Sequence, residues 1–312
     1  MKKIISFRKQ IKGNIHTHTT RTDGEFSVDE IIKLYKKNEY SFLAITDHRI
    51  YYSQEIDYEN FIVLNGCEYN CYLKDEKLNQ DIHFHILTLE DNLVKATNPI
   101  KHNDNLYKSL FFDSLSQVQE LINELKSRGN LIIIAHPKNK LIPLYMLINL
   151  VNYHGIEVYN TKANSDASDY SNELLINNKD IFLTSVDDSH NYYDENNNIN
   201  FFRGFIVLAD NILNRKNIIQ AIKEKNFYAS NGPYIYEIII DKERVLIECS
   251  NVRKIVLFGY DNNHNVKLIT TKSETFLNEA IFMLHDSYEF IRLECINEEK
   301  KKAWTNIIKM HY

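Results

Sequence analysis

Histidine and carboxylate side chains recur in this 312-residue sequence at the polar ends of short apolar runs. Seven of the twelve histidines occupy such places, namely His16, His18, His48, His83, His85, His136 and His190. Carboxylates accompany them at Asp23, Glu68 and Asp188. Burying so many ionisable groups without a cation would be very costly. Imidazole and carboxylate together suit Zn, Mn or Fe, so the pattern predicts a site for more than one metal ion.

Two pairs of these histidines are separated by a single residue. Residues i and i+2 of a strand share one face, so His16 and His18 can present both imidazoles to one cation, and His83 and His85 can do the same. A lone His-x-His pair is a weak indication, and the nearby carboxylates strengthen it. A carboxylate can bridge two ions while a hydroxide bridges them on the other side.

The elements that must position these residues alternate between strand and helix up to about residue 230, which predicts an α/β fold with parallel strands. Ser27 and Glu30 form a capping box for a helix that runs to about residue 39, and Ser116 with Gln119 opens a second helix ending near Gly129. A third helix is expected over residues 211–226. The expected strands are 13–18, 42–48, 61–68, 131–136, 155–160 and 181–190. The candidate ligands thus fall near the C-terminal ends of strands, where the loops of barrel enzymes converge.

The sequence changes character after the turn-rich segment 227–233. Seven short strands without long helices are expected over 234–241, 245–249, 254–260, 266–271, 281–284, 290–296 and 303–310. This pattern predicts a small all-β, sandwich-like unit. We therefore expect two domains, 1–233 and 234–312.

Composition restricts the partners and the compartment. The net charge is −5, with 37 basic and 42 acidic residues, so the overall charge of the chain does not attract it to phosphate backbones. Long nucleic acids are therefore not favoured as partners. The N-terminus lacks an apolar signal region, and no segment is long and apolar enough to span a bilayer. The four cysteines show no disulfide-framework spacing. We expect a cytoplasmic protein without a membrane partner, and the sequence does not indicate an oligomeric state.

The chain resembles the PHP (polymerase and histidinol phosphatase) family over about residues 13 to 233. The segment 16–24, HTHTTRTDG, is similar to the opening HxH motif of the family with its following Asp-Gly, and residues 46–48 are similar to its TDH motif. Residues 66–68, 135–137 and 188–190 match the bridging glutamate, the later HP motif and the closing DxH. The segment 227–233 and Trp304 resemble a branch that carries a small β domain at its C-terminus.

This resemblance implies a distorted (β/α)7 barrel and a centre of two or three divalent transition-metal ions (Zn, Mn or Fe). The implied ligands are His16, His18, Glu68 and Asp188 for one ion, Glu68, His85 and His136 for the second, and Asp23, His48 and His190 for the third. In the segment 81–87, either His83 or His85 can be aligned to the ligand of the family. We favour His85 because Ile86 and Leu87 resemble the pattern that follows it, and His83 stays the alternative.

The implied chemistry is phosphoester hydrolysis, in which a bridging metal-bound hydroxide attacks phosphorus. Glu68, Asp188 and His190 would act through that hydroxide as the catalytic residues. Basic side chains near the motifs are candidates to bind the phosphate of the substrate, and they are Arg21, Arg49, Lys138 and Arg203. Asp47 and Asp187 are expected to orient their neighbours.

Three functions compete on the sequence alone. The first is a phosphatase or phosphodiesterase acting on a phosphorylated small molecule or nucleotide. The second is a nuclease acting on short oligonucleotides. The third is a metal-binding module without catalysis, which the complete ligand set disfavours. The acidic net charge favours the first function over the second.

Overall fold

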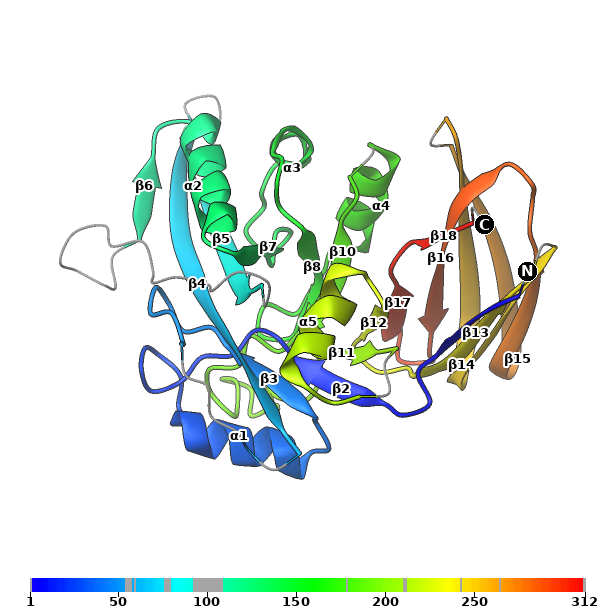
Figure 1. The fold of residues 1–312 in the computed structure, drawn as a ribbon, viewed down its shortest axis with the longest axis horizontal. Helices are drawn as coiled ribbons and strands as arrows, with labels where there is room; N and C mark the ends of the chain where they lie inside the picture. Colours follow the sequence, from blue (N-terminus) through cyan, green and yellow to red (C-terminus); the bar gives the residue numbers. More distant parts are fainter. Residues whose placement is uncertain are drawn as a thin grey trace.

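The computed structural model describes residues 2–53, 58, 60–75, 80–91, 109–177, 179–209, 212–241, 243–263 and 265–310. It is a mixed α/β structure with many strands and few helices (Figure 1), which confirms the predicted class. The strands up to residue 230 are β1 (Lys3–Ser6), β2 (Ile11–Asn14), β3 (Phe42–Ile45), β4 (Ile62–Asp75), β5 (Gln80–Glu90), β6 (Leu110–Phe112), β7 (Asn130–Ala135), β8 (Gly155–Asn160), β9 (Ser165–Asp166), β10 (Phe182–Val186), β11 (Phe205–Leu208) and β12 (Phe227–Ser230). The helices are α1 (Val28–Lys37), α2 (Leu115–Ser127), α3 (Leu144–Asn149), α4 (Ser168–Ile176) and α5 (Arg215–Lys223).

The strands at the centre of this unit are buried along their whole length. Every residue of β3, β7, β8 and β10 is buried, which explains why they appear in the sequence as continuous apolar runs. β2, β3 and β4 pair in parallel, and so do β7, β8 and β10. β5 is antiparallel to both β4 and β7, so those two run in the same direction. The loops after all six parallel strands therefore leave from the same side.

The parallel strands that the sequence predicts are present, and β5, which was not among the expected strands, lies between β4 and β7 and is antiparallel to both. β4 also continues seven residues past the predicted end at Glu68. In that extension Tyr69, Cys71 and Leu73 are buried while Asn70 and Tyr72 are half-buried, and this alternation is typical of a strand with two different faces. The result is a long hairpin-like pair, β4 and β5, that carries Glu68 and His85 side by side.

The sheet does not close on itself among the described strands. β11 pairs antiparallel with β2 and with β12, and no backbone ladder within the described ranges joins β10 to β11 or β12. A single parallel bridge between Thr17 and Ser189 links the loops after β2 and β10. The seven-fold barrel stays a prediction.

Helix boundaries follow the capping residues. Ser27 and Glu30 form the predicted capping box at the start of α1. α2 begins after Ser114 rather than at Ser116, because Gln119 does not cap it and instead donates to the carbonyl of Val151. α5 is shorter than the predicted 211–226, and it begins at Asn214, whose side chain accepts from the backbone N–H of Asn217. None of the described helices is long and apolar enough to cross a bilayer.

The strands after residue 234 are β13 (Ile235–Ile240), β14 (Arg244–Asp261), β15 (Val266–Met283), β16 (Tyr288–Ile296), β17 (Lys302–Thr305) and β18 (Ile308–Lys309). They pair antiparallel throughout. The predicted separate strands 245–249 and 254–260 are one strand, because register shifts around Val252 absorb the polar residues between them. The predicted strands 266–271 and 281–284 likewise belong to the single strand β15.

The first and last parts of the chain lie together. β1 pairs with β13, and β17 pairs with β12 (Figure 1). Near α4, the indole nitrogen of Trp304 donates to Ser168 (2.9 Å), and the Lys302 ammonium lies 2.7 Å from a carboxylate oxygen of Asp166. These contacts attach the C-terminal strands to the segment that follows β8. The domain division at residue 233 stays a prediction.

Candidate metal centre

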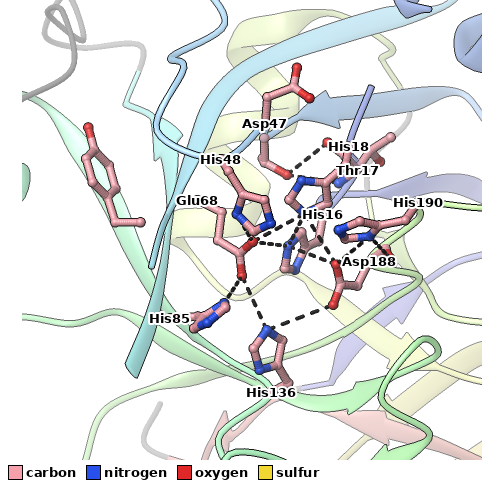
Figure 2. Close-up of polar contacts among 12 residues, drawn as sticks. His16, Thr17, His18, Asp47, His48, Glu68, His85, His136, Asp188 and His190 are labelled. Carbon is pink, nitrogen blue, oxygen red and sulfur yellow. Dashed lines mark hydrogen bonds and ion pairs between the residues drawn. The ribbon is translucent and has the colours of Figure 1, made fainter. Parts of the chain in front are cut away.

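The candidate ligands come from different segments of the chain and converge in space, and all of them except Asp23 are labelled in Figure 2. His16 and His18 follow β2, His48 follows β3, His136 follows β7, and Asp188 and His190 follow β10. Glu68 and His85 are the two that lie within strands, β4 and β5. Asp23 lies in the loop before α1. All nine residues that we favoured as ligands are therefore brought together.

Glu68 lies at the centre of the cluster and is 1% exposed. Its Oε1 atom is 2.9 Å from Nδ1 of His85 and 3.3 Å from Nε2 of His136. Its Oε2 atom is 3.0 Å from Nδ1 of His48 and 3.3 Å from Nε2 of His18. One carboxylate therefore faces histidines from every part of the cluster, as a bridging ligand would.

The remaining carboxylates lie on either side of Glu68. Oδ1 of Asp188 is 3.4 Å from Nε2 of His16 and 3.3 Å from Nε2 of His18. Oδ2 of Asp23 is 3.4 Å from Nε2 of His48 and 3.3 Å from Nε2 of His190. Three groups of these residues have ligand atoms within 4.8 Å of one another: His18, Asp23, His48 and His190; His16, His18 and Glu68; and Glu68, His85 and His136.

These residues fit divalent cations on two grounds. Several of their buried polar atoms have no hydrogen-bond partner within the described part of the chain, and they include Oδ1 of Asp188 and Nε2 of His190, which both face the cluster. Such orphaned atoms are costly unless a ligand satisfies them. Donors around one tetrahedral ion with bonds of 2.0–2.1 Å lie about 3.3 Å apart, which matches the Glu68 and Asp188 contacts to His18, both 3.3 Å.

The charges within the cluster support one another. Burial alone would raise the pKa of the Glu68 carboxyl, but His16, His85 and His48 hold that pKa well below its usual range. Burial lowers the pKa of His85 and of His190. Burial would also lower the pKa of His16 and of His48, but Asp188 and Glu157 raise that of His16 well above its usual value, and Glu68 with Asp23 raises that of His48 to about 10. The shifts therefore favour an ionised Glu68 and neutral imidazoles at His85 and His190, the forms in which these residue types bind metal.

Three residues of the site adopt left-handed backbone angles. His136 has a φ of 30°, Asp188 of 53° and Arg49 of 56°. Such angles are uncommon for residues other than glycine and concentrate at functional sites. Each of the three lies just past the end of a strand, so the turn redirects the chain at the point where the candidate ligands leave the sheet.

A second layer of carboxylates holds the loops. Asp47 accepts from the backbone N–H (2.7 Å) and hydroxyl (2.8 Å) of Thr19. Asp187 accepts from the Tyr35 hydroxyl at 2.7 Å and from the backbone N–H of Gly204 at 2.8 Å. Both therefore orient loop segments around the cluster, which is the kind of role expected from the sequence.

Glu157 is a site residue that the sequence analysis did not single out. Its Oε1 lies 2.6 Å from Nδ1 of His16, and its Oε2 accepts from the backbone N–H of His136 (2.8 Å) and from Nδ2 of Asn160 (2.9 Å). Asn160 in turn lies 3.2 Å from Oδ2 of Asp188. The signal in the sequence was a charged residue in the middle of the otherwise apolar strand 155–160.

The ambiguous histidines of β5 have different surroundings. Nδ1 of His85 lies 2.9 Å from Glu68, whereas the ring of His83 lies against Tyr72, with ring centroids 4.1 Å apart. His85 is thus part of the cluster, and His83 is not in any of the three candidate ligand groups of the described residues.

A cavity of about 220 Å³ opens onto the cluster, and its basic lining residues are Lys140 and Lys162. The four predicted phosphate-binding residues do not line it. Arg21 lies 3.8 Å from Asp47, Arg49 is 4% exposed, and the Lys138 ammonium binds both carboxylate oxygens of Asp169 at 2.9 Å. Arg203 contacts Asp187 through its backbone N–H. Lys140 lies only two residues beyond Lys138 in the sequence. Proximity to the His136 motif could not show that Lys140, and not Lys138, lines the cavity.

Fold and site together define an α/β protein with a buried His, Asp and Glu cluster that can hold divalent cations. No protein-family profile matches the chain. Among curated proteins the chain is similar to the DNA polymerase/3'-5' exonuclease PolX of Bacillus subtilis (strain 168), with 29% identity over 152 residues. The match covers 43% of this chain and 24% of that protein, so the chain spans about a quarter of the length of this relative.

Among solved structures, the chain is similar to a two-domain protein of Bacteroides vulgatus that contains a predicted PHP-like metal-dependent phosphoesterase. The identity is 14% and the TM-score 0.49, with 96% of this chain and 95% of that one covered. The chain is also similar to an amidohydrolase of Chromobacterium violaceum, at 14% identity and a TM-score of 0.41, with 57% and 87% covered. The first of these two structures contains a predicted member of the family whose motifs the sequence resembles.

Proposed function

We propose that this protein is a metal-dependent hydrolase of phosphoester bonds that holds two or three divalent transition-metal ions, Zn, Mn or Fe. The observation that carries the proposal is the position of Glu68, whose two carboxylate oxygens face His85 and His136 on one side and His18 and His48 on the other. A buried carboxylate shared in this way is the arrangement that joins neighbouring ions.

The proposed ligands are the nine residues His16, His18, Asp23, His48, Glu68, His85, His136, Asp188 and His190, and all of them except Asp23 are labelled in Figure 2. Ions bound there lower the pKa of coordinated water and neutralise the charge of phosphoryl oxygens. Glu68, Asp188 and His190 hold the centre where the reaction takes place. Glu157 and Asn160 fix the orientation of His16 and Asp188.

Lys140 and Lys162 are the residues we propose to bind the phosphate of the substrate. Both line the cavity over the cluster, together with His85 and His190. Two cations beside a metal centre favour a dianionic phosphate. A phosphorylated small molecule or a nucleotide is therefore the proposed substrate.

The test combines metal content with turnover. We expect elemental analysis of protein expressed with added Mn or Zn to find two or three ions per chain, and less than one ion contradicts the proposal. We expect Asp188→Asn and His136→Ala to reduce hydrolysis of an aryl phosphate by at least about 100-fold. Glu120→Gln, an exposed change on α2, is the matched control. Circular dichroism establishes that each variant is folded.

A second candidate function is a nuclease acting on short oligonucleotides. It is supported by the similarity to PolX, whose name includes a 3'-5' exonuclease. Turnover of short single strands by the metal-loaded protein, faster than turnover of phosphorylated small molecules, would favour it.

The finer architecture is also a proposal. We infer that the N-terminal unit is a distorted (β/α)7 barrel and that residues 234–312 form a small β domain. The same-direction strands β2, β3, β4, β7, β8 and β10 support the barrel. The antiparallel strands β13 to β18 support the β domain.

A further inference from the structure

A row of three aromatic side chains crosses neighbouring strands beside the metal centre. Tyr72 of β4 is the register partner of His83 on β5 and of Phe111 on β6. The Tyr72 and Phe111 rings are stacked, with centroids 5.1 Å apart and an interplanar angle of 15°. The His83 ring meets Tyr72 edge-on, with centroids 4.1 Å apart. We call these three residues the aromatic row.

The aromatic row lies on the same face of the sheet as the metal centre. Glu68 and Tyr72 are four residues apart on β4, and His85 and His83 are two apart on β5. Side chains separated by an even number of positions in a strand share a face, at about 6.5–7 Å for each pair of residues. His83, the member of the aromatic row on β5, therefore lies about 6.5–7 Å along the strand from His85. Tyr72 lies on β4 beyond Glu68, toward the C-terminal end of that strand.

Asn70 lies on β4 between Glu68 of the metal centre and Tyr72 of the aromatic row. It is the register partner of His85 and sits on the same face as Glu68 and Tyr72. Its Oδ1 atom is buried and has no hydrogen-bond partner in the part of the chain that the structure describes. A buried acceptor without a donor is costly, and this one lies at the point that a ligand joining the cluster to the aromatic row would cross.

The aromatic row is open to solvent at Phe111. Phe111 is 73% exposed, which makes it the most exposed large hydrophobic side chain of the described residues. A single exposed phenylalanine needs no explanation. This one is stacked on a tyrosine of the strand that supplies Glu68, while His83 meets the same tyrosine edge-on. The ring face of Phe111 that does not contact Tyr72 is therefore the part of the aromatic row that a ligand can reach.

We propose that the aromatic row is a stacking platform for the base of a nucleotide whose phosphate lies at the metal centre. This inference rests on the proposed function and specifies its substrate. Bases stack on aromatic side chains with little dependence on their identity, because every base has a π-face. The sugar of such a substrate passes Asn70, whose Oδ1 accepts a hydrogen bond from a sugar hydroxyl. Lys140 and Lys162 then bind the phosphate.

The test compares substrates with and without a base in the Mn-loaded protein. We expect kcat/KM for adenosine 5'-monophosphate to exceed that for ribose 5-phosphate by about 5- to 150-fold, the range that corresponds to one stacked base. Phe111→Ala and Tyr72→Ala lower kcat/KM for the nucleotide by about 10-fold, mainly through KM, and the loss is confined to the substrate that carries the base. Phe276→Ala, which removes an exposed phenylalanine on β15, is the control and changes neither substrate.

The outcomes separate the platform from the proposed function. Equal losses for both substrates in Phe111→Ala, or no preference of the native protein for the nucleotide, overturn the platform while leaving phosphoester hydrolysis intact. If neither of these two substrates is turned over, hydrolysis of the aryl phosphate decides the proposed function, and equilibrium dialysis of the same two compounds decides the platform. Tighter binding of the nucleotide that Phe111→Ala weakens supports it, and equal binding overturns it.

Discussion

Oε1 of Glu157 lies 2.6 Å from Nδ1 of His16. This buried contact leaves Nε2 of His16 facing Glu68 and Asp188, at 3.4 Å from each. A carboxylate that holds one ring nitrogen fixes the tautomer and the orientation of the other. His16 therefore points its other ring nitrogen into the cluster because of Glu157, a residue of strand β8, which is not a pairing partner of β2.

Glu157→Gln tests this relationship. We expect the amide to keep the shape of the side chain but to weaken its hold on His16, so that metal affinity or turnover falls by about 10- to 100-fold. Titration of metal-free protein with Mn, followed by assay of an aryl phosphate, measures both quantities. Glu173→Gln, an exposed change on α4, serves as the control. Unchanged affinity and turnover in Glu157→Gln would contradict the role.

The two histidines of β5 should respond differently to truncation. His85 lies 2.9 Å from Glu68, whereas His83 lies against Tyr72. We expect His85→Ala to lose metal and turnover, because an ion is left without a donor, and His83→Ala to retain its metal. Elemental analysis of the two variants, prepared in parallel, decides between them. Loss of metal only in His83→Ala would mean that the ligand assignment on this strand is shifted by two residues.

Most of the candidate centre could be predicted from sequence because its residues lie within short motifs. The HxH, TDH and DxH segments each hold their candidate ligands within a few positions of a strand end, so the strand places them without help from the rest of the chain. Glu157 and Lys162 could not be found in this way. Glu157 stands out as a charged residue within an apolar run, but its contacts with His16 and His136 depend on how distant segments pack. The position of Lys162 depends on where a loop turns, and no local pattern encodes that.

The fold was predictable to a similar extent. Fully buried strands such as β7 appear in the sequence as apolar runs of the correct length. The antiparallel entry of β5 was missed because direction depends on pairing partners rather than on composition. The predicted breaks within β14 and β15 were wrong because bulges let a strand continue past polar residues.

Lys140 and Lys162 provide a prediction about substrate binding, because they line the cavity over the cluster and Lys138 does not. We expect Lys140→Ala and Lys162→Ala each to raise KM for a phosphorylated substrate by about 10-fold or more, as the loss of one charge-assisted hydrogen bond implies. Lys138→Ala is the matched control, since its ammonium already binds Asp169. A larger effect from Lys138→Ala than from the other two would reassign the phosphate site.

His154 directly precedes β8, at the end of that strand away from the metal centre. Its titration links the stability of the fold to pH. Its Nδ1 accepts a hydrogen bond from the backbone N–H of Ile132 at 2.9 Å, so the folded protein requires that nitrogen to be unprotonated. Burial lowers the pKa of His154 from 6.5 to about 4, with the charge of Lys126 and, more weakly, Lys223 acting in the same direction and Asp91 opposing. The unfolded chain has no such restriction.

The sign of the effect follows from the two pKa values. Above pH 6.5 the imidazole is neutral in both states, and His154 adds no pH dependence. Between pH 6.5 and about 4 the unfolded chain takes up a proton that the folded protein does not, so the free energy of unfolding falls as the pH falls. Below about pH 4 both states bind the proton, and the contribution of His154 becomes constant.

Urea denaturation at about pH 7.5 and about pH 5 measures this contribution. We expect the native protein to lose roughly 2 kcal/mol more stability over that interval than His154→Gln does, since the glutamine cannot titrate while its side-chain oxygen still accepts a hydrogen bond. His285→Gln, at an exposed histidine, controls for the removal of an imidazole. Comparing each variant with the native protein cancels the titration of the metal centre, which all three share. Parallel pH profiles for the native protein and His154→Gln would show that the imidazole of His154 does not set this part of the stability.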